Sequence, residues 1–179
     1  MGSIRTSFWM LCVISACAVV SGCVSYSTYP EVKGLAPSNP NFIHVKPIVR
    51  ESIKEIITQF HQDEFGTFAV NLPKGMTLEA QYSILDALDD RARLLTSQTL
   101  DRPIYHVGRI WVRGTHAKVD IVRPILELGP SPSDVVTYQG MTVWLEGGVY
   151  PWGVTRVQPW SIGVVSPPEL NLLDEETPG

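Results

Sequence analysis

The chain has 179 residues, with 14 lysines and arginines against 18 aspartates and glutamates, so its formal net charge is −4. This length suits a single domain with tails. Lysine and arginine do not run together anywhere in the sequence. Their dispersal argues against a nucleic-acid-binding protein and against a polybasic membrane patch.

The first 22 residues are predicted to be an export signal. Arg5 lies ahead of an apolar run from Phe8 to Val20 that only Ser15 interrupts. As a helix this run of about 13 residues is roughly 20 Å long, which is too short to cross ~30 Å of hydrocarbon. A basic start, a short apolar core and small residues after it are typical of a secretory signal peptide.

The residues VSGC at positions 20–23 resemble the lipobox of bacterial lipoproteins, which is an aliphatic residue, two small residues and a cysteine. The resemblance implies that diacylglycerol is attached to the Cys23 sulfur. It also implies that the signal, residues 1–22, is cut off before Cys23 and that the new amino group is acylated. The residues ISAC at 14–17 fit the same pattern, so Cys17 is an alternative. Cleavage there would leave a very short apolar core, which favours Cys23.

A lipid on Cys23 implies a protein of the cell envelope, anchored in a membrane with its domain on the extracytoplasmic side. Position 24 is valine, whereas aspartate there favours retention in the inner membrane of enteric-type Gram-negative bacteria. By that resemblance, a Gram-negative source would hold the protein in the outer membrane, facing the periplasm. The expected partners are the membrane, through the lipid, and another envelope protein or a cell-wall polymer.

The rest of the chain carries no sequence sign of a cofactor, a metal site or a catalytic centre. All three cysteines lie at positions 12, 17 and 23, so none is left beyond residue 23 for a disulfide or a metal. No HExxH, nucleophile-elbow or phosphate-loop motif occurs. We therefore expect a protein without catalytic activity.

Composition divides the remainder into three parts. Residues 23–42 are rich in proline and serine and are predicted to be a tether without regular structure. Residues 166–179 are predicted to be an acidic, disordered tail. The single folded domain is expected at residues 43–165.

Helical periodicity marks the first half of this domain. Ile53, Ile56 and Phe60 lie on one side of an amphipathic pattern that predicts a helix over about 47–61. A short apolar run at 67–72 predicts a strand. Thr77 is a suitable N-cap for a second helix that reaches about residue 90 or 95.

From residue 103 the period changes to two and predicts two hairpins. Their strands and turns are 104–113 with 116–122 around Gly114-Thr115, and 141–145 with 152–154 around Gly147-Gly148. Pro151 and Pro159 place the last strand at a sheet edge, because proline cannot donate to an inner ladder.

This order of elements predicts an α+β fold, with N-terminal helices packed on one face of a four-stranded antiparallel meander sheet. The order is similar in shape to cystatin-like and nuclear-transport-factor-like folds. A similarity of shape carries no function.

The first hairpin contains the main candidate binding surface. With Gly114-Thr115 as its turn, Arg109 lies opposite Asp120 and Trp111 lies opposite Lys118, on the face away from the apolar one. Trp144 of the second hairpin is expected to join them. A solvated sheet face with an ion pair and a cation–π contact is one interpretation. A partner surface is the other, because aromatic residues and arginine are enriched in interface cores. We expect a non-catalytic binding or assembly module.

The same register places His106 opposite Arg123 on the apolar face. If the sheet curves over the helices, these two residues lie at the mouth of a pocket. A histidine beside an arginine favours an anionic ligand, so a small-ligand-binding or weakly enzymatic pocket protein is the alternative function. The other interpretation of His106 is a histidine satisfied at the margin of the core.

Overall fold

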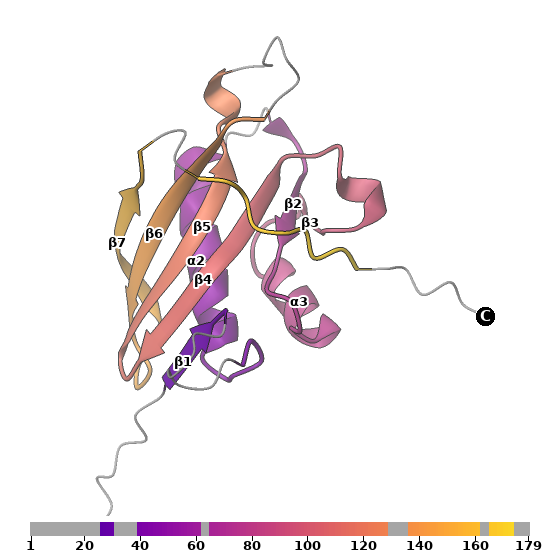
Figure 1. Cartoon of the computed structure of the whole chain (residues 1–179). Coiled ribbons are helices and arrows are strands. Elements are labelled where there is room, and N and C mark those ends of the chain that lie inside the picture. Colours follow the sequence, from indigo (N-terminus) through magenta and orange to yellow (C-terminus); the bar gives the residue numbers. More distant parts are fainter. Residues whose placement is uncertain (1–25, 31–38, 62–64, 129–135, 162–164, 174–179) are drawn as a thin grey trace, which may run out of the picture.

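The computed structural model describes residues 26–30, 39–61, 65–128, 136–161 and 165–173, and the fold is α+β as predicted (Figure 1). In chain order its elements are β1 (Tyr26–Tyr29), α2 (Val45–Phe60), β2 (Phe68–Asn71), α3 (Leu78–Leu85), β3 (Ala92–Leu94), β4 (Ile104–Arg113), β5 (His116–Pro124), β6 (Tyr138–Glu146) and β7 (Gly153–Pro159). Short 3-10 helices occupy Ser97–Thr99 and Leu126–Leu128. Among the helices described, none has the length and apolar character needed to cross a membrane.

In the part of the chain that the structure describes, the sheet is mixed and has seven strands, not the four predicted. Its order is β3-β2-β4-β5-β6-β7. Strands β1 and β2 lie on the same side of β4: β2 pairs with the first half of β4, and β1 pairs with the second half. Strands β4 to β7 form the predicted antiparallel meander, whereas β2 runs parallel to both β3 and β4. The predicted edge position of β7 is confirmed.

Helix α2 covers one face of the sheet and lies behind β4 and β5 in Figure 1. Its buried stripe includes Ile48, Ile53 and Ile56, none of which has any exposed surface. These side chains belong to one hydrophobic core with Ile110, Val112, Ala117, Val119, Ile121, Met141, Val143 and Leu145 of the sheet. The amphipathic pattern predicted this helix to within two residues at each end. We call the opposite side of the sheet the open face.

Strand β1 lies inside the segment predicted to be an unstructured tether. Its register pairs Tyr26 with Arg113 and Tyr29 with Ile110. Thr28 is buried, and Tyr29 packs against the hydrophobic core. The tether prediction is therefore wrong at these four residues. So short a strand shows no period of its own, and its hydrogen-bond partners are far away in the sequence.

Helix α3 begins as predicted and ends early. The backbone N–H of Ala80 donates to the Thr77 hydroxyl at 3.4 Å, which confirms the N-cap. The chain then turns into β3 through Asp89, whose carboxylate accepts bonds from the backbone N–H and the guanidinium of Arg91 at 2.8–2.9 Å. These bonds hold the pKa of Asp89 at about 2 and replace the last turns of the predicted helix.

A β-bulge interrupts β4 at Gly108 and Arg109. Val107 pairs with Ile121 but Ile110 pairs with Val119, so two residues of β4 lie opposite Asp120 alone. The pairing of Trp111 with Lys118, which lies between the bulge and the turn, is confirmed. Pairings on the other side of the bulge are shifted by one residue from the predicted register. A shift of one residue moves a side chain to the other face of the sheet.

Residues 165–173, which we call the C-terminal strap, are the yellow segment that crosses the open face in front of β4 (Figure 1). The Asn71 side chain binds its backbone twice: Nδ2 donates to the Glu169 carbonyl and Oδ1 accepts from the Asn171 N–H, both at 3.0 Å. The N–H of Leu173 donates to the Leu95 carbonyl at 3.1 Å. The prediction of a disordered tail is therefore wrong as far as residue 173, and residues 174–179 lie outside the described residues.

Candidate functional site

The open face carries a row of side chains at one level across four strands. Trp111 of β4 pairs with Lys118 of β5, Lys118 pairs with Trp144 of β6, and Trp144 pairs with Arg156 of β7. Directly paired residues of neighbouring strands share a face and lie close together. The register therefore aligns indoles and cations alternately, and we call these four residues the cation–indole row.

Cation–π contacts connect the row. The Lys118 Nζ atom lies 5.2 Å from the ring centroid of Trp111 and 5.9 Å from that of Trp144. The guanidinium carbon of Arg156 lies 3.8 Å from the Trp144 centroid, and that of Arg113 lies 5.1 Å from the Trp111 centroid. Each such contact is worth about 0.5–1 kcal/mol at an exposed site. They order the two indoles while both remain half-buried.

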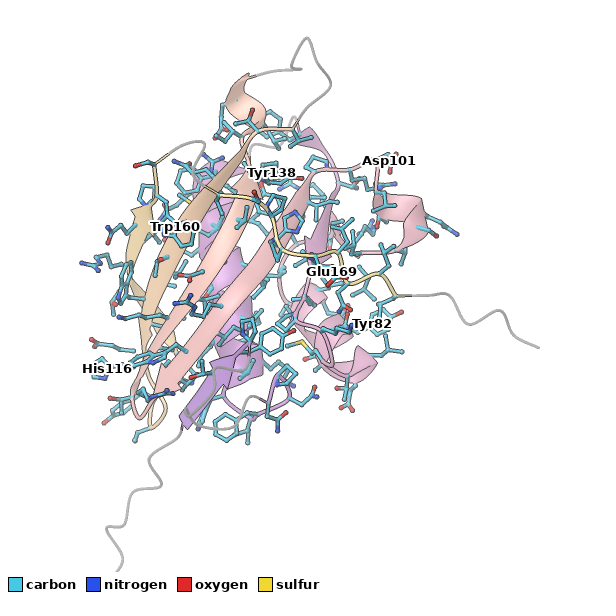
Figure 2. All side chains as sticks on the ribbon, viewed as in Figure 1. Tyr82, Asp101, His116, Tyr138, Trp160 and Glu169 are labelled. Carbon is cyan, nitrogen blue, oxygen red and sulfur yellow. The ribbon has the colours of Figure 1, made fainter. Side chains whose placement is uncertain are left out.

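A third indole, Trp160, follows β7 and covers Gly140 of β6 on the same face (Figure 2). A Cβ atom added at Gly140 would collide with three atoms of the indole, so the ring needs glycine beneath it. The Trp160 Nε1–H donates to the Thr142 hydroxyl at 2.9 Å, and this hydroxyl donates to Asp120 Oδ1 at 2.7 Å. These bonds fix Trp160 and Asp120 beside the row.

Two hollows on the open face meet at Arg109, Asp120 and Trp160. One, of about 550 Å³, is lined by these residues with Thr142 and most of the cation–indole row. The other, of about 510 Å³, lies between the sheet, β1 and the C-terminal strap. Arg109 is exposed, and its guanidinium forms no hydrogen bond or ion pair with the part of the chain that the structure describes. Its exposed side chain lines both hollows and can therefore be reached by a ligand.

The open face is basic although the chain is acidic. Its charged side chains around the row are the cations Arg109, Arg113, Lys118 and Arg156 and the carboxylates Asp120 and Glu146. Glu146 lies 3.6 Å from the imidazole of His116. The cations outnumber the carboxylates here, so this face is positive whereas the whole chain has a formal charge of −4. A positive face attracts anionic groups.

The structure separates His106 from Arg123, which the predicted register placed side by side. His106 pairs with Val122 and so points to the open face. It is only 1% exposed. Because an amide nitrogen can only donate, His106 Nδ1 accepts its 3.1 Å bond from Asn71 Nδ2. The same Asn71 group holds Glu169 of the C-terminal strap, so His106 is a buried residue beside the strap.

Arg123 lies on the helix side of the sheet. Successive residues of a strand point to opposite faces, so Arg123, which follows Val122, points away from His106. Its guanidinium carbon lies 4.3 Å from the ring centroid of Phe60 on α2, and its Nη1 donates to Glu127 at 2.9 Å. Both predicted pocket residues are buried, and they lie on opposite faces. The prediction of a shared pocket mouth is therefore wrong, because the bulge in β4 shifts the register between them.

His106 makes the stability of the fold depend on pH. Burial lowers the pKa of its imidazole from 6.5 to about 4, whereas in the unfolded chain it titrates near 6.5. Between these values the unfolded chain binds a proton that the folded chain does not. We expect the contribution of His106 to the free energy of unfolding to fall by about 3 kcal/mol as the pH drops from 7 to 4.

Denaturant unfolding of wild type and His106→Gln at several pH values checks this expectation. The carboxylates titrate equally in both proteins, so the difference between the two unfolding free energies isolates His106. Wild type should lose its advantage over the variant as the pH falls below about 6.5. A difference that does not change with pH would show that the imidazole is not held neutral.

Arg156 and Trp160 belong to this surface although the sequence pattern did not predict them there. A two-residue turn at Gly147-Gly148 would have paired Trp144 with Pro151. The observed connection between β6 and β7 spans residues 147–152, and it brings Arg156 beside Trp144 instead. No local sequence pattern predicts the length of this connection. Trp160 did have a sequence signal, because it is a tryptophan just after the last strand that no predicted element used.

The fold and the surface together define an α+β domain with a basic, indole-bearing open sheet face. The chain matches no protein-family model, and no curated protein or solved structure is significantly similar to it. Within the described ranges, no group of three or more histidine, cysteine, aspartate or glutamate side chains gathers closely enough to hold a metal ion. Cys23 and the predicted signal lie outside the described residues.

Proposed function

We propose that this protein is a lipoprotein of a bacterial cell envelope and that its domain is a non-catalytic binding module. In this proposal the lipid on Cys23 anchors the chain, and the open face binds another envelope protein or a cell-wall polymer. The observation that carries the binding function is the cation–indole row beside the exposed Arg109. The anchor rests on the lipobox resemblance alone.

Three properties of the open face support binding. The cation–π contacts hold Trp111 and Trp144 in place before any partner arrives, which lowers the cost of ordering them. The hollow beside the row has a volume of about 550 Å³, within the range of ligand sites. The excess of cations favours a partner that presents carboxylates or phosphates, since complementary charge guides association.

Replacing both Trp111 and Trp144 by alanine is expected to weaken partner binding at least tenfold. Aromatic anchors at the centre of an interface contribute about 2 kcal/mol or more each, and 1.4 kcal/mol corresponds to a factor of ten. Two measurements check the expectation. One is photo-crosslinking in intact cells from a probe at Thr155, which lines a small hollow next to the row, and the other is co-sedimentation with purified cell-wall sacculi.

Tyr82→Ala is the matched control, because Tyr82 is an exposed aromatic residue on α3, away from the row (Figure 2). The control should keep wild-type adducts and wild-type sedimentation. Both variants must unfold cooperatively for the comparison to hold. Equal binding by wild type and the double variant would exclude the open face as the binding surface.

A further inference from the structure

The three most exposed large hydrophobic residues of the described chain are Val149, Tyr150 and Ile43. Their side chains are 84%, 79% and 75% exposed, whereas the other exposed hydrophobic side chains reach at most 54%. Scattered exposed apolar residues are ordinary on protein surfaces. A gathering of the most exposed ones at a single place indicates a surface that contacts something apolar.

These residues gather at one end of the sheet. Val149 and Tyr150 belong to the connection between β6 and β7, whose Gly147 N–H donates to the carbonyl of Thr115 in the β4–β5 turn at 3.0 Å. Ile43 precedes His44, whose Nδ1 lies 3.4 Å from Nε1 of Trp152 in the same connection. We call this end of the molecule the turn end. In Figure 2 it is the end marked by His116, and Asp101 marks the opposite end.

The turn end is also where the chain enters the fold. β1 starts at Tyr26, which pairs with Arg113 at the last position of β4 before the turn. Only two residues, Val24 and Ser25, separate this strand from Cys23. Three fully extended steps reach at most about 11 Å, so a lipid on Cys23 would keep the turn end at the level of the lipid headgroups. The long tether predicted from sequence would have allowed the domain to stand far from the bilayer.

The chemistry of the turn end suits the boundary between water and lipid. A tyrosine with an apolar ring and a polar hydroxyl favours this boundary. Trp152 is 7% exposed and packs behind the connection as part of the core, so the exposed residues have a rigid base. Besides the exposed carboxylate of Glu146 at the end of β6, this end carries the cations Lys46 and Arg113, at the start of α2 and the end of β4. They complement anionic phospholipid headgroups.

We propose that the turn end is a membrane-docking surface, in which Ile43, Val149 and Tyr150 insert between the headgroups of the bilayer that holds the Cys23 lipid. This inference rests on the proposed lipid anchor. Docking fixes the orientation of the domain: the strands stand up from the bilayer, and the open face turns sideways, available to a partner in the plane of the envelope.

The test uses the lipidated full chain reconstituted in vesicles of phosphatidylethanolamine and phosphatidylglycerol. No free thiol remains after lipidation, so Val149→Cys provides a unique site for an environment-sensitive fluorophore. Asp101→Cys, at the opposite end, is the matched control (Figure 2). We expect the fluorophore at position 149 to show a blue-shifted emission. Spin-labelled acyl chains added to the vesicles should quench this emission. Neither effect is expected at position 101.

Mass spectrometry of the same sample reports the lipid separately. If the lipid is absent, the proposed anchor fails and docking fails with it. If the lipid is present but position 149 is quenched no more than position 101, docking alone is wrong. A blue shift at position 149 that depends on protein concentration and not on the lipid quencher would assign the turn end to a protein contact and overturn the proposal. Adding Tyr150→Asp and Ile43→Asp to the labelled Val149→Cys protein should remove the quenching while the protein stays anchored.

Discussion

Replacing Cys23 by serine is expected to abolish lipid attachment and to leave the export signal on the chain. Diacylglycerol transfer needs the thiol sulfur, and the lipoprotein-specific cut normally follows it. The variant should therefore accumulate with residues 1–22 attached. The wild-type protein should lack these residues and carry acyl chains, each CH₂ of which contributes about 0.8 kcal/mol to membrane binding. Intact mass and partitioning between detergent and aqueous phases check both expectations.

Cys17→Ser is the matched control, because the residues ending at Cys17 fit the same lipobox pattern. It should behave as wild type. If it loses the lipid while Cys23→Ser keeps it, cleavage occurs at Cys17. If neither substitution changes acylation, removal of the signal or partitioning, the chain is not a lipoprotein, and both the anchor and the membrane-docking surface are ruled out.

Removing β1 is expected to lower the free energy of unfolding by about 3 kcal/mol. The strand supplies backbone hydrogen bonds to residues 110–113 of β4, each with a net worth of about 0.5–1.5 kcal/mol. It also supplies the Tyr29 ring that packs on the core and the buried Thr28, whose hydroxyl accepts a bond from Arg113 at 3.0 Å. Denaturant unfolding of chains that begin at Ser25 and at Asn39 measures the difference.

The chain that begins at Ser25 retains β1 and lacks Cys23. It should fold, because no disulfide is needed, and it should remain in the aqueous phase, because it carries no lipid. The chain that begins at Asn39 should be the less stable of the two. Equal stability would show that β1 adds nothing to the stability of the domain, as expected for the predicted tether without regular structure.

Local patterns were sufficient for the elements that carry their own signal. The spacing of Ile53 and Ile56 gave α2, and the alternation on either side of Gly114 gave the β4–β5 hairpin. Thr77 marked the start of α3. The pairing of Trp111 with Lys118 followed from the turn, because only two residues separate each of them from the turn and no bulge intervenes.

Local patterns gave a wrong result where an extra residue in a strand shifts the register, or where a partner far away in the sequence orders a segment. The bulge at Gly108 placed His106 beneath the strap and left Arg123 against Phe60. An isolated glycine within a strand pattern is a known sign of a bulge, so this error had a visible warning. Gly108 also has little room for a side chain, since an added Cβ would lie 3.2 Å from the Asp120 carbonyl.

The sequence by itself determined the class of fold, the main helix, the meander and the lipobox-like cysteine, because each is encoded by residues near one another in the chain. Only the tertiary structure decided that β1 and the C-terminal strap belong to the domain. Their partners, Arg113 and Asn71, lie far along the chain, and neither segment has a period of its own. It also aligned Trp111, Lys118, Trp144 and Arg156 across four strands, since register depends on the bulge and on the length of the connection after β6.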